Sequence, residues 1–316
     1  MLQYLIFLLD DTSTSYCHYT NNKTEKRLIS LDNLKAGILF AMKRNLTIQF
    51  VYPSYELPAT HKEAIETIDH VKIIPSESEN AAIADVLVFN SCENFLKGQK
   101  EKHQDRIFVL RTNRQELFNQ DNYLKNLVEK ITRLNVIITD IETFTEEDFE
   151  RYKKWLLKLS SSMNNIYRNG KVPQINLLTD RILLKKMNNC NAGHENITLA
   201  PNGEFYVCPA FYIEDEKDSI GNLKSDLDIK NQRLYKLEYA PLCRNCDAYQ
   251  CKRCVWLNRK TTLEVNTPSH EQCVVSHLER NASINLLKKL KPAGYFPDVE
   301  ISTIDYLDPF DVVKQF

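Results

Sequence analysis

The stretch Cys243-Arg244-Asn245-Cys246-Asp247-Ala248-Tyr249-Gln250-Cys251-Lys252-Arg253-Cys254 contains two pairs of cysteines, each with two residues between its members. This spacing lets a tight turn direct both sulfurs at one point. Thiolates are the preferred ligands of zinc and of iron–sulfur clusters. The segment therefore predicts a metal site rather than a set of free thiols.

Three further cysteines flank this segment: Cys190 and Cys208 before it, and Cys273 after it. Seven of the nine cysteines thus lie within residues 190–273, where even spreading along 316 residues would place about two. Pro201-Asn202-Gly203 is a turn sequence between strand candidates at 197–199 and 204–207. A hairpin there would bring Cys208 back beside Cys190.

The first 180 residues alternate strand and helix signals, which predicts a mostly parallel sheet covered by helices. The expected strands cover residues 2–9, 46–52, 71–74, 86–89, 106–110, 136–138 and 174–178. The first expected helix is capped by Ser30 or Asp32 and runs to about Arg44. Further helices are expected over residues 61–68 and 115–133, and a long one begins at Thr145. The residues expected to face the core are Leu34, Ile38, Leu39 and Met42 on the first helix, and Phe149, Tyr152, Leu156, Leu159 and Met163 on the last.

Composition excludes several classes of function. The 41 basic and 42 acidic residues nearly cancel and are interspersed, so neither nucleic acid nor an anionic membrane is an expected partner. The apolar run Leu2–Leu9 is too short to span a bilayer and lacks the flanks of a signal peptide, so we expect a cytoplasmic protein. In that compartment thiols stay reduced, which favours metal over disulfides.

The cysteine pattern resembles the SPASM domain of radical SAM peptide-modifying enzymes. The resemblance covers Cys190, Gly203-x4-Cys208, Cys243-x2-Cys246-x4-Cys251-x2-Cys254 and Cys273, with the last two inner spacings each one residue shorter than is usual. Ser219-Ile220-Gly221-Asn222-Leu223 is also similar to that family. The segment 245–280 resembles, more narrowly, the CXXX repeat peptide maturases.

This resemblance implies two auxiliary [4Fe–4S] clusters. One would use Cys190, Cys208 and Cys254, and the other Cys243, Cys246, Cys251 and Cys273. The first set has only three thiolates, whereas family members often have another cysteine shortly after the first. His194 stands near that position, so it is a candidate fourth ligand; otherwise it is a structural histidine and the site is open. His270 and His277 are weaker candidates.

The resemblance also predicts a partial (β/α) barrel over residues 1–180, a SPASM-like domain over 181–290 and a tail over 291–316. Radical SAM enzymes carry a Cys-x3-Cys-x2-Cys motif just after the first strand, but this chain has only Cys17 there, and Tyr52–Pro58 replaces the expected Gly-Gly-Glu-Pro loop. We therefore expect a degenerate domain that does not cleave S-adenosylmethionine. Cys17 is then a vestige, a contact for a substrate thiol, or a small buried residue.

These features predict a protein that binds a ribosomally made, cysteine-rich precursor peptide and acts with a radical SAM partner; its catalytic residues are unknown. One alternative is a zinc-binding scaffold or peptide-recognition module without catalysis, because four-cysteine sites often bind zinc. Another is an unrelated enzyme that uses carboxylates near strand ends, as α/β folds often do. The candidates for that role are Asp10, Asp11, Glu56, Asp140 and Glu142.

Overall fold

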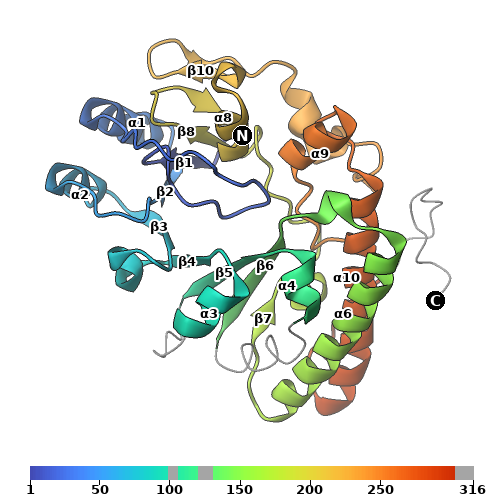
Figure 1. The fold of residues 1–316 in the computed structure, drawn as a ribbon. Helices are drawn as coiled ribbons and strands as arrows, with labels where there is room; N and C mark the ends of the chain where they lie inside the picture. Colours follow the sequence, from blue (N-terminus) through green and yellow to red (C-terminus); the bar gives the residue numbers. More distant parts are fainter. Residues whose placement is uncertain (99–105, 120–130, 303–316) are drawn as a thin grey trace.

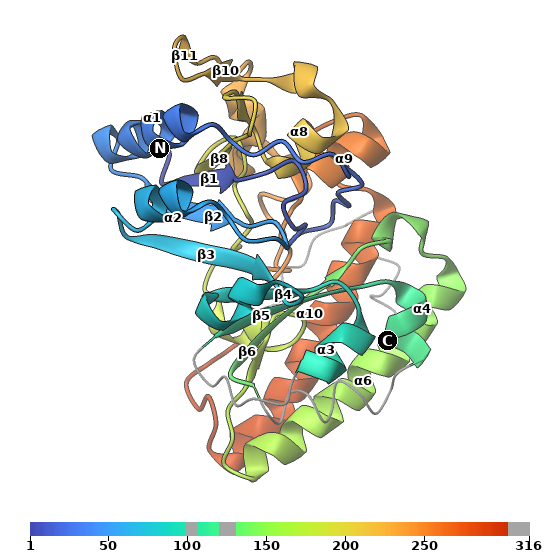
Figure 2. The same cartoon turned by 60° about the vertical axis from the view of Figure 1, so that its left-hand side comes forward.

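The central sheet of the computed structural model orders its nine strands β7-β6-β5-β4-β3-β2-β1-β8-β9 (Figures 1 and 2). The structure describes residues 1–98, 106–119 and 131–302. Neighbouring strands run parallel from β7 to β8, and only β9 is antiparallel to its neighbour. This arrangement confirms the predicted α/β fold with a partial barrel and an adjoining cysteine-rich region.

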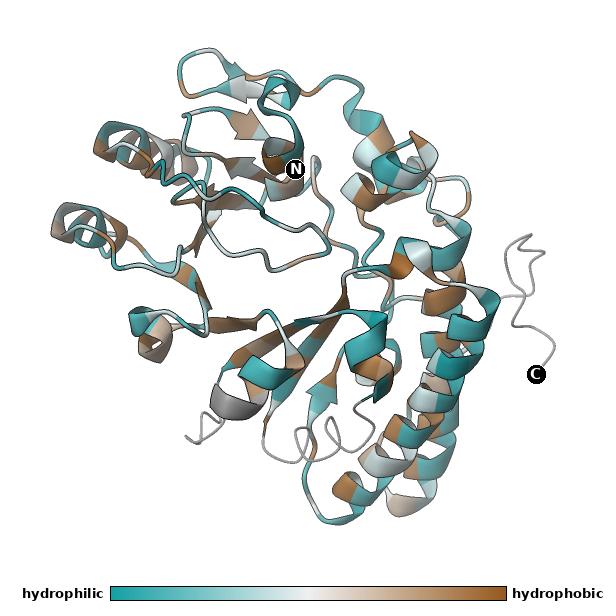
Figure 3. Cartoon of the chain, viewed as in Figure 1, coloured by the Kyte–Doolittle hydropathy of each residue, from teal (hydrophilic) through white to brown (hydrophobic). Residues whose placement is uncertain are grey.

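The strands follow the predicted positions closely, and each is short and largely buried. Figure 3 shows that β4–β6 are mainly hydrophobic, as expected of strands covered on both faces. The strands of the sheet are β1 (Tyr4–Leu8), β2 (Thr47–Val51), β3 (His70–Pro75), β4 (Val86–Phe89), β5 (Ile107–Thr112), β6 (Arg133–Ile138), β7 (Gln174–Ile175), β8 (Asn196–Leu199) and β9 (Phe205–Tyr206), and a separate small hairpin pairs β10 (Gly221–Asn222) with β11 (Asp226–Leu227).

The helices connect successive strands or surround the cysteine-rich region. The helix predicted over 115–133 begins as α4; residues 120–130 lie outside the described part, and Arg133 already opens β6. The described α-helices are α1 (Leu31–Lys43), α2 (Ala59–Ile65), α3 (Cys92–Gly98), α4 (Arg114–Asn119), α6 (Glu146–Arg168), α7 (Thr179–Leu183), α8 (Pro209–Glu214), α9 (Val255–Thr262) and α10 (His270–Leu290).

Helix α1 begins where the sequence predicts, because the side chain of Ser30 accepts a hydrogen bond from the Asn33 N–H at 3.1 Å. The predicted core face is wrong in part: Leu39 and Met42 are 50% and 59% exposed. The helix instead buries Leu34, Gly37, Ile38 and Ala41, which are spaced i, i+3, i+4 and i+7. Small Gly37 and Ala41 let the helix approach the sheet closely, and this approach sets which face turns inward.

Helix α6 has the predicted cap and the predicted core face. The Thr145 hydroxyl accepts from the Asp148 N–H, and Asp148 accepts from the Thr145 N–H, which completes a capping box. All five residues expected to face the core are buried. Along its buried side α6 lies beside α10 of the cysteine-rich region, as both views show (Figures 1 and 2).

The cysteine-rich region is joined to the barrel at more than one place. Strand β8 pairs with β1 in parallel, with Tyr4 opposite Asn196 and Phe7 opposite Leu199. The first residues of the tail also return to the barrel, because the Tyr295 hydroxyl donates to the Tyr167 carbonyl at the end of α6 at 2.6 Å. The cysteine-rich region is therefore held against the edge of the sheet next to β1 and the loop that follows it.

Candidate metal centres

The first group of cysteines lies where β8, β9 and the turn before α9 meet. The Cys190 N–H donates to the Lys252 carbonyl at 3.3 Å, which places Cys190 beside the Cys251–Cys254 turn. The predicted hairpin forms as β8 and β9, with Gly203 at φ +82° in its turn, and delivers Cys208 to the N-cap of α8. Cys254 is the N-cap of α9, and its Sγ accepts from the Leu257 N–H at 3.5 Å.

These three thiols are close enough for their charges to interact. Burial raises the pKa of Cys254 well above its usual value, and the charges of Cys190 and Cys208 raise it further. The pKa of Cys208 is likewise raised by burial and then by Cys190. Cys190 as a residue is exposed, whereas its thiol is desolvated by the surrounding protein, which raises the pKa of that thiol. A cation shared by the three sulfurs would relieve this repulsion.

Cys17 lies within electrostatic range of the same thiols, a position that was not predicted from its sequence context. It lies in the loop after β1, and burial raises its pKa, followed by the charges of Cys190 and Cys254. Arg111, at the end of β5, holds this loop: its Nε donates to the Cys17 carbonyl at 3.0 Å and one terminal nitrogen to the Tyr19 carbonyl at 2.6 Å. One feature of the sequence could have pointed to Cys17: the first predicted ligand set has only three thiolates and therefore needs a fourth ligand from elsewhere in the chain.

His194 lies in different surroundings. Desolvation lowers its pKa first, followed by the Met1 amino group and Lys236, while Glu195 and Glu238 act in the opposite direction. Its Nδ1 atom is buried and has no hydrogen-bond partner in the described structure. Its role as a ligand stays a prediction.

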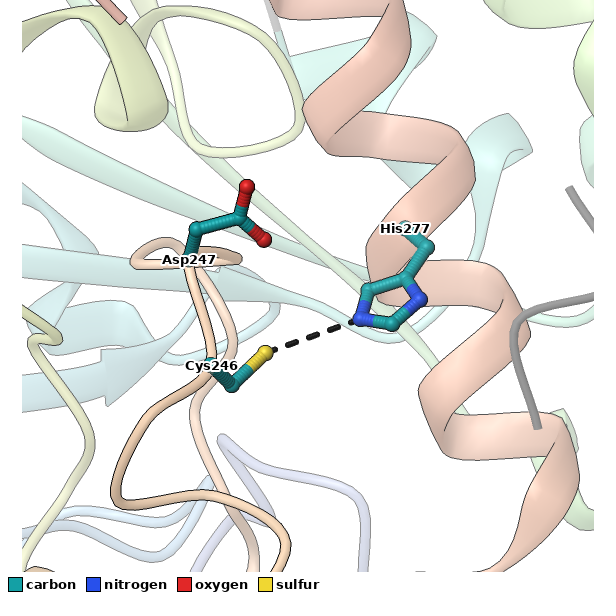
Figure 4. A group of neighbouring side chains, drawn as sticks. All are labelled: Cys246, Asp247 and His277. Carbon is teal, nitrogen blue, oxygen red and sulfur yellow. Dashed lines mark hydrogen bonds between the residues drawn. The ribbon is translucent and has the colours of Figure 1, made fainter. Parts of the chain in front are cut away.

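The second group lies between the 243–251 loop and the first turns of α10. The Gln250 side chain donates to the Ser276 carbonyl at 2.6 Å, which fixes the loop against the helix. Cys273 and His277 are one helical turn apart on α10, so they lie on the same side of it. Cys246 Sγ is 3.5 Å from His277 Nε2, as Figure 4 shows. From the sequence, His277 was a weaker candidate ligand than His194. In the structure, His277 lies beside the predicted ligand Cys246.

Asp247 completes a group of three potential ligand atoms, with Cys246 and His277, that lie within 4.8 Å of one another. The Asp247 carboxylate also accepts from Arg280 at 2.6 Å, and both side chains of this ion pair are almost fully buried. Arg280 thus donates to one oxygen of the Asp247 carboxylate. Asp247 is therefore positioned by a charge of the protein itself, whichever metal the neighbouring thiols bind.

Backbone N–H groups point at three of the predicted ligand sulfurs. The Ala248 N–H donates to Cys246 Sγ at 3.4 Å, the Arg253 N–H to Cys251 Sγ at 3.4 Å, and the Leu257 N–H to Cys254 Sγ at 3.5 Å. Such bonds favour the thiolate form and tune the potential of a bound cluster.

The basic residues of this region differ in what they contact. Arg259 binds Glu214 and Asp218 at the surface, so it belongs to a surface ion-pair network. Arg253 is only 2% exposed; one terminal nitrogen donates to the Tyr235 carbonyl, whereas Nε and Nη1 have no hydrogen-bond partner. Its charge acts on Cys190 and partly offsets the rise in the pKa of that thiol that desolvation causes. A buried guanidinium with unsatisfied donors calls for a nearby anion.

The mouth of the barrel contains a separate polar cavity of about 420 Å³ at the carboxyl ends of the strands. Its lining is rich in hydroxyl and amide groups and includes Ser13, Ser54, Asn90, Arg111 and Glu116. Parallel α/β folds bind ligands at this edge.

The carboxylates considered for an unrelated enzyme are each paired with a neighbour. Asp10 accepts from the Tyr55 hydroxyl at 2.8 Å, and Asp11 accepts from Arg27 Nε at 3.0 Å. The remaining pairs are Glu56 with Lys62, Asp140 with Arg114, and Glu142 with Lys260. Each of these carboxylates therefore has a structural partner in the described structure.

No known family profile and no curated protein matches the sequence. Solved structures of anSMEcpe, an anaerobic sulfatase-maturating radical SAM enzyme with a SPASM domain, do match the fold. The form described as native with bound AdoMet is 13% identical and aligns with a TM-score of 0.58 over 92% of this chain and 100% of the other. The form with bound AdoMet and Cp18Cys peptide is 14% identical, with a TM-score of 0.57 over 92% and 99%.

The chain has the fold of a radical SAM enzyme with a SPASM domain. This likeness extends along nearly the whole of both chains, so it includes the cysteine-rich region as well as the barrel. At 13–14% identity, the likeness is one of fold. Among the described residues, no helix is long and apolar enough to cross a membrane.

Proposed function

We propose that this chain is a peptide-maturation protein that binds two [4Fe–4S] clusters and a cysteine-rich ribosomal precursor, and that a partner enzyme initiates the radical. The observation that supports this proposal most is the unequal distribution of cysteines between the C-terminal region and the loop after β1. Seven cysteines lie in the C-terminal region, among them Cys208 and Cys254 at the N-caps of α8 and α9 and Cys273 in α10, whereas the loop after β1 contains only one cysteine. The chain thus retains auxiliary ligands but lacks the motif that starts the reaction.

The donor set fits iron–sulfur clusters. One centre would be held by Cys190, Cys208 and Cys254, and the other by Cys243, Cys246, Cys251 and Cys273. The backbone N–H groups that reach Cys246, Cys251 and Cys254, and the unsatisfied buried guanidinium of Arg253, suit anionic thiolates and sulfides. When bound, the clusters would supply one-electron transfer close to the peptide.

Peptide binding is proposed from the fold and from the surface beside the first group. Two of the similar structures contain bound peptide, namely Cp18Cys and Kp18Cys in anSMEcpe. In this chain a cavity of about 380 Å³ is lined by residues of the loop after β1 and of the helices that Cys208 and Cys254 cap, including Tyr19, Lys23, Ile213 and Trp256. Its mixture of aromatic, aliphatic and charged side chains suits a peptide segment. The narrower assignment to CXXX repeat maturation belongs to this proposal.

The direct test is an anaerobic count of iron, sulfide and zinc in the purified chain. We expect about eight iron and eight sulfide per chain. In Cys251→Ala we expect about half of that iron, because the second centre loses a ligand. Cys92→Ala is the matched control: Cys92 is buried, its Sγ lies 3.4 Å from the Thr112 hydroxyl, and it belongs to neither predicted set. About two zinc with no iron or sulfide would contradict the proposal and support the zinc scaffold.

The second test concerns the division of labour. The chain is incubated with S-adenosylmethionine, a reductant and a cysteine-rich precursor peptide, with and without a radical SAM enzyme that co-purifies with it. We expect 5′-deoxyadenosine and modified peptide only when the partner is present. Modification of the peptide by this chain alone would contradict the proposed partnership.

A further inference from the structure

Residues of the loop after β1 line two cavities that also involve the two helices capped by cysteines of the first group. His18 lines a narrow cavity of about 60 Å³ together with Cys251 and Cys254. Tyr19 lines a larger cavity with Ala210 of α8 and Trp256 of α9. These two helices are capped by Cys208 and Cys254. Cys17 directly precedes His18 in this loop, so the chain brings it close to the start of both helices.

The loop is held in this position by fixed contacts. Arg111 is 7% exposed and binds the carbonyls of Cys17 and Tyr19. His18 Nδ1 lies 3.0 Å from the Ile138 carbonyl at the end of β6. These bonds attach Cys17 to the ends of two barrel strands.

The electrostatics agree with this placement. The charges of Cys190 and Cys254 act on Cys17, and the charge of Cys17 acts on Cys208. Lys252 acts on both Cys17 and Cys190 in the opposite sense. The four thiols are therefore within electrostatic range of one another, and Lys252 partly offsets the charge of two of them.

Arg253 supplies an independent indication that an anion is bound here. Its side chain is almost completely buried beside Cys190, and its Nε and Nη1 atoms lack hydrogen-bond partners. A single thiolate carries one charge, whereas a cluster with four thiolates also presents bridging sulfides as acceptors.

We propose that Cys17 is the fourth ligand of the centre formed by Cys190, Cys208 and Cys254, an inference that rests on the iron–sulfur function proposed above. The loop that carries the S-adenosylmethionine-binding cluster in radical SAM enzymes would then donate its one cysteine to an auxiliary centre. Four thiolates occupy all four irons. This centre is therefore closed to substrate, and it serves electron transfer or stability rather than capture of a peptide thiol.

The test compares Cys17→Ala, Cys17→Ser, His194→Ala and Cys92→Ala, all purified anaerobically. The readouts are iron and sulfide content and Mössbauer and EPR spectra, none of which requires peptide modification. We expect Cys17→Ala to lose between one iron and one whole cluster, with a three-iron EPR signal after oxidation when a single iron is lost. Cys17→Ser keeps the size of the side chain and offers an oxygen ligand, so it should retain four irons with one altered Mössbauer site.

The outcomes separate this inference from the proposed function. If the wild-type protein has two clusters and both Cys17 variants match it in iron, sulfide and spectra, the assignment of Cys17 is wrong while the proposed function stands. If His194→Ala changes the first centre and Cys17→Ser does not, His194 is the ligand. If the wild-type protein contains zinc without sulfide, the proposed function itself fails. Retention of the second cluster in Cys17→Ala shows that the chain has folded; if all iron is lost there, the spectra of Cys17→Ser decide.

Discussion

The Tyr152 hydroxyl on α6 donates a hydrogen bond to Glu279 Oε1 on α10 at 2.8 Å. This bond joins a barrel helix to the helix that carries Cys273, so it connects the two predicted domains through a buried polar contact. Burial raises the pKa of Glu279 to about 7, although the donors Tyr152 and Gln250 act in the opposite direction. Glu279 therefore holds a proton in the folded protein under conditions where an unfolded chain has lost it.

We predict that this carboxyl makes stability fall as pH rises. Between about pH 4.5 and pH 7 the folded state binds more protons at Glu279 than the unfolded state, so the free energy of unfolding decreases with pH across that window. Glu279→Gln keeps the hydrogen-bonding shape without the titration. Urea unfolding at pH 5 and pH 8 should show the variant gaining stability over wild type at the higher pH. Exposed Glu238→Gln is the control; an equal gain there, or no gain in Glu279→Gln, would refute the prediction.

The buried pair of Arg280 and Asp247 leads to a second prediction. Their side chains are 6% and 1% exposed, so Arg280→Met should remove the guanidinium bound to a buried carboxylate and cost about 3–5 kcal/mol. The double variant Arg280→Met with Asp247→Asn should recover much of that loss. The comparison is Lys230→Met at the exposed pair with Asp228, which should cost less than about 1 kcal/mol. Equal losses at both pairs in denaturant unfolding would contradict the burial argument.

Gly37 should resist even the smallest side chain. A Cβ there would lie 2.4 Å from Leu199 Cδ2 and 2.6 Å from Phe7 Cε1. Alanine favours helices intrinsically, but overpacking against β1 and β8 should outweigh that gain and destabilise Gly37→Ala by about 1–3 kcal/mol. Lys35→Ala, at an exposed position of the same helix, should be close to neutral. Stabilisation by Gly37→Ala would show that the helix can move away from the sheet without cost.

His277 should tune the second centre rather than hold it. We predict that His277→Ala keeps the iron content of the wild type but makes the reduction potential of that cluster more negative, because a hydrogen bond to Cys246 Sγ stabilises the reduced, more negative state. Spectroelectrochemistry measures the shift, and Lys288→Ala at an exposed position near the end of α10 is the control. Loss of iron in His277→Ala would identify His277 as a ligand instead.

Secondary structure could be predicted from the sequence where local chemistry decides it. Ser30 and Thr145 cap their helices by short-range hydrogen bonds, and β4 occupies the predicted residues 86–89. The inward face of α1 could not be predicted from hydrophobicity alone, because Leu39 and Met42 are good core residues by type. The close approach allowed by Gly37 decides that face, and it depends on side chains of β1 and β8, which are distant in the sequence.

The sequence alone predicted the metal-binding region, because two residues between cysteines already define a turn that both thiols share. The alternation of strand and helix signals predicted the α/β fold beside it. The position of Cys17 was decided only by the tertiary structure. More than 170 residues separate it from Cys190, and no local pattern encodes their proximity. Pairing of β1 with β8, and the hydrogen bonds from Arg111, bring the loop after the first strand to the caps of α8 and α9. Long-range strand pairing and buried polar contacts, rather than sequence spacing, therefore determine which sulfurs meet.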